Sequence, residues 1–265
     1  MARPTVSTLT ARAHQSQAWI EKLLYLASPI LLILAWELAG RTNIVDTRFF
    51  GLPSEIAHTF RSMLESGELL SHLRASLTRI LLGFAIGALA GATLGCLMGF
   101  SRTIRAGLLP IVAALFPIPK LAVLPLLLLV FGVGQKTAIS LVAIGVFFVQ
   151  LFATMDGVIN LPHSYREVSA AFGASRSQFV RIVALPGALP SILTGLKLSM
   201  GIALLLIVAA EFVGTRVGIG YLIWSSWEVF AVEKMYVGLV VLALLGFITN
   251  IGLEQMERRL IPGRR

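Results

Sequence analysis

Few side chains in this 265-residue sequence have the types and spacing that enzyme chemistry needs. The four histidines are scattered, and none belongs to a metal-binding pattern such as His-Glu-x-x-His. The sequence has neither a Gly-x-Ser-x-Gly turn nor a Cys-x-x-Cys pair. The stretch from Gly132 to Thr137 contains Gly, Lys and Thr, but not at the spacing of a phosphate-binding loop. We therefore predict that this chain has no catalytic residue and no metal site.

Charged side chains within apolar segments are another sign of chemistry, because they often mark proton or ion pathways through membranes. They are few here. Glu211 lies near the end of an apolar segment, whereas Lys120 lies within one, beside Pro119. Lys120 could face a polar pathway and attract an anion, extend to the interface, or mark a re-entrant break. We take Pro117, Pro119 and Lys120 as candidate pathway residues, and we expect the energy source to be a partner.

The composition indicates that these segments cross a membrane. Hydrophobic residues make up 57% of the chain and charged residues only 13%, whereas a soluble domain has about 25% charged residues. The net charge of +9 does not indicate a nucleic-acid partner, because Lys and Arg lie between the hydrophobic blocks and not on one basic face.

We expect an all-α polytopic membrane protein, since about 20 apolar residues are enough to span the hydrocarbon core as a helix. The third of six expected spans contains four prolines and should be kinked or broken. The six spans are Leu23–Gly40, Ile80–Phe100, Gly107–Phe131, Thr137–Gly157, Ser191–Phe212 and Met235–Leu253.

The flanking charges predict the orientation and the domain boundaries. Lys and Arg are more frequent on the side that holds both termini and the loop 158–190, which places that side in the cytoplasm. We expect a cytoplasmic tail over 1–22, a transmembrane domain over 23–257, and a basic cytoplasmic tail over 258–265. The first apolar block lacks a cleavage site and is expected to remain as a membrane helix.

Two further patterns predict local structure. Between the first two spans, Ser54 should cap an interfacial helix whose apolar face contains Ile56, Phe60, Met63 and Leu64. In the second span, glycines recur at every fourth residue and form a bare ridge along one helix face. That ridge packs either inside the bundle or against a second copy of the chain; its members are Gly83, Gly87, Gly91, Gly95 and Gly99.

The loop 158–190 carries the most informative pattern. The capping box Ser164–Glu167 should begin a short helix, and Gly173 should end it in a left-handed conformation. The second capping box, Ser175–Gln178, should begin another helix that stops near Pro186. The first helix exposes small residues and one aromatic side chain, which suits insertion into a groove on another protein.

This segment resembles the EAA loop in the membrane subunits of ATP-binding cassette (ABC) importers. Glu167, Gly173, Leu185 and Pro186 match that pattern, and Val168 and Ser169 replace its two alanines. Residues 116–125, 131–134, 189–197 and 209–212 are also similar to the nitrate/sulfonate/taurine/bicarbonate branch of these permeases.

The resemblance implies the transmembrane domain of a type I ABC importer. It would act as a homodimer in the bacterial inner membrane, with two ATPase subunits that bind ATP and Mg²⁺ and an external solute-binding protein. The solute would be small and anionic. The residues implied in coupling to the ATPase are Glu167, Val168, Ser169, Ala170, Ala171, Phe172, Gly173, Leu185 and Pro186.

The alternative is a secondary transporter driven by an ion gradient. It predicts paired intramembrane carboxylates and inverted repeats, and the sequence shows neither.

Overall fold

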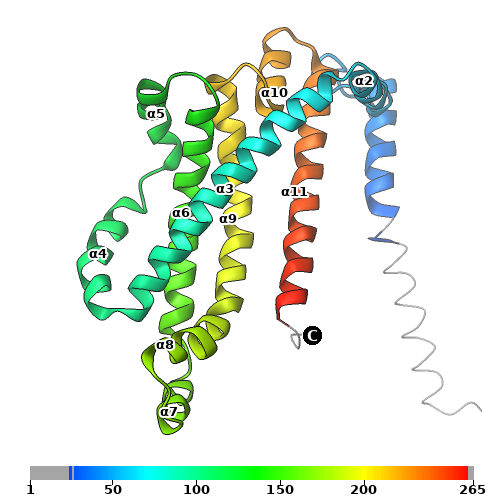
Figure 1. The fold of residues 1–265 in the computed structure, drawn as a ribbon. Helices are drawn as coiled ribbons and strands as arrows, with labels where there is room; N and C mark the ends of the chain where they lie inside the picture. Colours follow the sequence, from blue (N-terminus) through cyan, green and yellow to red (C-terminus); the bar gives the residue numbers. More distant parts are fainter. Residues whose placement is uncertain (1–23, 26, 262–265) are drawn as a thin grey trace, which may run out of the picture.

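The computed structural model describes residues 24, 25 and 27–261, and within them the predicted all-α fold is confirmed (Figure 1). The predicted tail 1–22 lies outside the described residues, as does the end of the tail 258–265. A helix covers residues 27–41. The remaining elements are α2 (Pro53–Glu65), α3 (Glu68–Phe100), α4 (Arg102–Leu115), the 3-10 helix η1 (Lys120–Val123), α5 (Leu124–Phe131), α6 (Gln135–Ile159), α7 (His163–Ala171), α8 (Arg176–Gln178), the π-helix η2 (Phe179–Ala184), α9 (Leu185–Gly214), α10 (Ile219–Glu228) and α11 (Val232–Leu260).

Four helices in the described part of the chain are long and apolar enough to cross a membrane: α3, α6, the continuous helix Arg176–Gly214, and α11. They correspond to the second, fourth, fifth and sixth expected spans. The third span is broken as predicted, since α4 and the η1–α5 segment meet at 86°. The first span is described only in part. α3 begins at Glu68, twelve residues before the predicted start at Ile80.

The predicted cap of α2 is wrong. The helix begins at Pro53, whose fixed φ suits the first helical position, so Ser54 lies inside the first turn. The carboxylate of Glu37 accepts hydrogen bonds from the Ser54 N–H at 3.0 Å and from its hydroxyl at 2.9 Å. On the predicted apolar face, Ile56 and Met63 are buried, but Leu64 is exposed. The start of α2 is therefore held by a side chain from the preceding helix.

The glycine ridge of α3 lies against α6 of the same chain. A Cβ at Gly95 would be 2.5 Å from the carbonyl oxygen of Leu151, and one at Gly83 would be 2.8 Å from that of Ile139. These distances leave no room for a side chain, so the two backbones touch along the ridge. The ridge was expected to pack either inside the bundle or against a second copy of the chain, and in the structure it packs inside the bundle.

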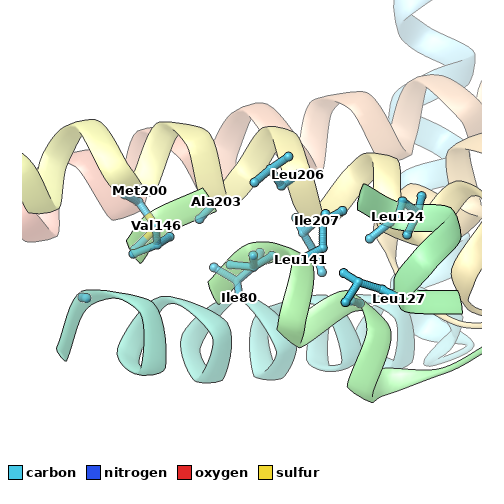
Figure 2. Close-up of a cluster of buried hydrophobic side chains, with 13 residues drawn as sticks. Ile80, Leu124, Leu127, Leu141, Val146, Met200, Ala203, Leu206 and Ile207 are labelled. Carbon is cyan, nitrogen blue, oxygen red and sulfur yellow. The ribbon is translucent and has the colours of Figure 1, made fainter. Parts of the chain in front are cut away.

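The largest buried apolar cluster joins α3, α5, α6 and α9 (Figure 2). Leu141 of α6 lies between Ile80 of α3 and Ile207 of α9, and Val146 of α6 lies near Met200 and Ala203 of α9. The most apolar stretch of α6 is 56% buried, more than that of any other candidate span in the described chain. α6 is therefore the central helix, and α9 is fixed to it by close packing along its length.

Candidate functional site

The loop between α6 and α9 projects beyond one end of the bundle, with α7 at its tip (Figure 1). α7 contains the predicted first short helix, and α8 with η2 leads back into the membrane-spanning α9. The end of α11 lies at the same end of the molecule (Figure 1). This loop holds seven of the nine residues that the sequence implied in coupling to an ATPase, and the other two, Leu185 and Pro186, begin α9 directly after it.

The predicted start of α7 is wrong by two residues. Pro162 precedes the helix in an extended conformation, α7 begins at His163, and no side chain caps it. Ser164 therefore lies within the first turn and cannot act as the cap. The carboxylate of Glu167 instead lies 3.1 Å from Nδ1 of His163, one turn away on the same face.

The predicted end of α7 is confirmed. Gly173 has a φ of +67°, in the left-handed region that favours glycine. Its N–H donates to the carbonyl of Ala170 at 2.9 Å, and the N–H of Ala174 donates to that of Ser169 at 3.1 Å. These two bonds form a Schellman motif, which satisfies carbonyls that the end of the helix would otherwise leave free. The chain reverses direction here.

The second capping box is confirmed, but the predicted stop near Pro186 is wrong. The Ser175 hydroxyl accepts from the N–H of Gln178 at 3.3 Å, and the Gln178 side chain accepts from the N–H of Ser175 at 2.8 Å. The helix then continues through Pro186, because the π-helix η2 precedes it. At the end of η2 the N–H of Leu185 donates to the carbonyl oxygen of Val180, five residues earlier. α9 then begins with Pro186 in its first turn, where a missing N–H is tolerated.

The C-terminal end of α7 exposes apolar side chains. Phe172 is 86% exposed, Val168 is 55% exposed, and Ala170 and Ala171 are also exposed. Ser169 is buried against the rest of the loop. A groove of about 900 Å³ separates α7 from η2, and Ile182 of η2 lines its other wall. The loop therefore presents an aromatic side chain beside an apolar groove, and this arrangement can bind another protein surface.

A buried ion pair that the sequence did not predict lies at the opposite end of the bundle. Nη1 of Arg79 in α3 lies 2.7 Å from a carboxylate oxygen of Glu211 in α9, and both side chains are buried. Ser76 donates to the same carboxylate at 2.8 Å, and the N–H of Gly220 donates at 2.9 Å. Arg79 also donates to the carbonyl of Val217. The pair thus joins α3, α9 and the start of α10.

The sequence contained one signal of this pair, the acidic residue at the end of an apolar segment. Its partner could not be read from the sequence, because Arg79 lies 132 positions earlier in what was expected to be an outer loop.

Lys120 lies at the break between α4 and α5. Its ammonium donates to the carbonyl of Phe116 at 2.7 Å, that of Ile118 at 2.9 Å and that of Leu115 at 3.2 Å. It also lies 4.3 Å from the centre of the Phe148 ring, within cation–π distance. The side chain thus satisfies the carbonyls that the end of α4 leaves free.

The fold is that of an ABC importer transmembrane subunit. It is similar to a chain of the inward-facing MetNI methionine ABC transporter, with a TM-score of 0.64 and 21% identity, covering 73% of this chain and 96% of that one. Residues 83–262 match the family described as binding-protein-dependent transport system inner membrane component, and the chain belongs to this family.

Relatives with curated names carry the same description. The chain is 35% identical to the putative aliphatic sulfonates transport permease protein SsuC of Bacillus subtilis, over 93% of this chain and 88% of that protein. It is 32% identical to the taurine transport system permease protein TauC of Escherichia coli, over 88% and 86%. The protein is therefore a multi-pass ABC importer permease, and the secondary-transporter alternative is not supported.

Proposed function

We propose that two copies of this chain form the membrane pathway of an ABC importer for a small anionic solute. The relatives are named for aliphatic sulfonates, taurine, nitrate and bicarbonate, and all four solutes are small and anionic or carry an anionic group. An external binding protein delivers the solute. Two copies of an ATPase subunit bind ATP and Mg²⁺ and hydrolyse the nucleotide, so the chain itself has no catalytic role.

The single observation that carries the coupling role is the exposed apolar tip of α7. Phe172 is 86% exposed at the end of a projecting helix. Exposure of this apolar surface to water is unfavourable in free energy, and burial of the ring in a groove on the ATPase would remove that penalty. The tip is formed or positioned by the residues implied in coupling, which include Glu167, the Ser169–Gly173 segment, Leu185 and Pro186. The ATPase binds on the cytoplasmic side, so the loop and both termini lie there, in agreement with the excess of Lys and Arg.

The break between α4 and α5 is our candidate for the lining of the pathway. The backbone at Pro117 and Pro119 leaves the helical path within an apolar segment, which membrane proteins tolerate where the backbone faces protein or a water-filled cavity. If Lys120 serves the pathway, Lys120→Gln should reduce uptake of the anion by the reconstituted transporter. Unchanged uptake would remove Lys120 from the pathway and leave the α7 assignment intact.

The docking assignment is tested by replacing Phe172 with alanine and co-purifying the ATPase subunit with the tagged chain in mild detergent. We expect F172A to lose most of the bound ATPase and of the transport-coupled ATP hydrolysis. The matched control is F230A, which removes a phenylalanine that is 74% exposed in the turn between α10 and α11. Equal retention of the ATPase by both variants would contradict the assignment.

A further inference from the structure

A second cavity lies on the other side of α7, between this helix, the start of the η2 segment and the end of α3. Its volume is about 400 Å³, and Phe100, Arg166, Ser169, Arg176 and Phe179 are among the residues that line it. Phe100 is the last residue of the membrane-spanning α3. Figure 1 shows the end of α3 beside α8. The cavity therefore lies at the end of a helix that is long and apolar enough to cross a membrane.

Two helix faces with the same spacing form its walls. α7 contributes residues 166, 169 and 170, and the α8–η2 segment contributes residues 176, 179 and 180. Positions i, i+3 and i+4 lie on one side of a helix, so each set is a single face with an arginine at its first position. On α7 this face is turned away from Val168 and Phe172, which line the larger apolar groove.

The arginines in this cavity are not neutralised within the part of the chain that the structure describes. No carboxylate there forms an ion pair with Arg166 or Arg176, and that of Glu167 is taken by His163. Arg102 follows Phe100 by two residues and adds positive charge. Two arginines that line one small cavity, with Phe100 and Phe179 also in its lining, can supply guanidinium groups for bidentate binding of a phosphate group.

From this geometry we propose that the cavity binds the phosphate of an anionic lipid headgroup, with Arg166 and Arg176 as its ligands. A lipid is favoured over a soluble anion because Phe100 places the cavity at the membrane surface, where acyl chains can continue along α3. Basic pockets on the cytoplasmic side of membrane proteins are typical sites for such headgroups. The orientation rests on the proposed function, since it places this end of the bundle in the cytoplasm.

The bound lipid would fill the space between α7 and the bundle. α7 contacts the rest of the protein mainly through the η2 segment, so an occupied cavity would fix its angle relative to α3. The importer would then hydrolyse ATP in step with transport only when anionic lipid surrounds it.

The test uses the complete transporter, delipidated in detergent and titrated with phosphatidylglycerol, phosphatidylcholine or inorganic phosphate, with bound lipid counted by native mass spectrometry. We expect tight binding of phosphatidylglycerol that the variant R166Q/R176Q weakens about tenfold or more. The matched control R61Q removes an exposed arginine from α2, which pairs with Glu65, and should bind the lipid as the parent does.

Three results would overturn the proposal. One is equal phosphatidylglycerol binding by the parent and R166Q/R176Q, and another is equal binding of phosphatidylcholine and phosphatidylglycerol. The third is displacement of the lipid by millimolar inorganic phosphate, which would assign the cavity to a soluble anion. Co-purification of the ATPase is scored separately. Its absence from the parent would contradict the proposed function, while the lipid count on this chain would still decide the cavity.

Discussion

The two ends of the bundle use arginine in opposite ways. At the end that holds α10, Arg79 is buried and pairs with Glu211, whose carboxylate also accepts from Ser76 and Gly220. At the end that holds α7, Arg166 and Arg176 are exposed and line a cavity without an acidic partner in the described chain. The first end is closed by interactions within the chain. The second end leaves these arginines and the apolar side chains of Val168 and Phe172 exposed.

The largest expected effect is at the closed end. Glu211→Ala leaves Arg79 buried without its counter-charge, which costs about 3–5 kcal/mol in buried pairs. We expect the purified variant to unfold at a clearly lower temperature, or to be recovered poorly from the membrane. The double variant R79M/E211L removes both charges and should regain much of the lost stability, because desolvation of the pair no longer has to be offset. A single variant as stable as the parent would show that the pair does not hold this end together.

The next effect is at the α3–α6 contact, which connects the two ends. A valine at Gly91 would force its side chain against the backbone of α6, and overpacking of this kind costs about 1–3 kcal/mol. Gly252→Val in α11 is the control, since nothing lies within 4 Å of a Cβ there. Thermal unfolding of both variants in detergent should show a loss for G91V alone. Equal losses would indicate that helix propensity and not packing decides the result.

A smaller effect on stability, with a large effect on function, is expected at the open end. Gly173→Val places a β-branched residue at a φ of +67°. The backbone strain costs about 1–2 kcal/mol and disturbs the point at which the chain reverses direction after α7. Global unfolding should change little, whereas transport per ATP hydrolysed should fall sharply. Normal coupling in G173V would contradict the role of α7. Gly107→Val in α4, where a Cβ has open space, serves as the control.

The smallest effect tests burial alone. Arg61 and Glu65 on α2 form an ion pair at 2.7 Å, the same distance as in the buried pair, but their side chains are 80% and 64% exposed. Water and salt screen such a pair, and its removal costs less than about 0.5 kcal/mol. We expect Arg61→Ala to unfold at nearly the same temperature as the parent. A loss similar to that of E211A would show that distance matters more than burial in this protein.

Most of the fold could be predicted from the sequence, because apolar length and glycine spacing are local properties. The broken third span, the left-handed Gly173 and the Ser175–Gln178 capping box are of this kind. The errors at Ser54 and Ser164 have one cause. Pro53 and Pro162 set the backbone before each serine, so the helix begins earlier than the capping pattern indicates.

The interactions that the sequence did not reveal are tertiary ones. Arg79 was placed in an outer loop, because no apolar run covers residues 68–79, yet α3 begins at Glu68 and buries Arg79 against Glu211. The carboxylate of Glu37 accepts from the N–H of Ser54 in the first turn of α2, which begins 16 residues after Glu37. Pro186 does not end its helix, because the bonding pattern of η2 removes the need for its N–H. The first two depend on a partner that only the folded chain brings near, whereas the third depends on the local bonding pattern of η2.

The continuous course of α9 has a mechanical consequence. Its 30 residues extend over about 45 Å at 1.5 Å per residue, from the loop that bears α7 to the turn that holds Glu211. A tilt of about 5° at one end of such a rod displaces the other end by about 4 Å. If a partner binds the loop as proposed, α9 would act as a lever, and a small rotation of the loop would move the far end of the helix by several ångströms.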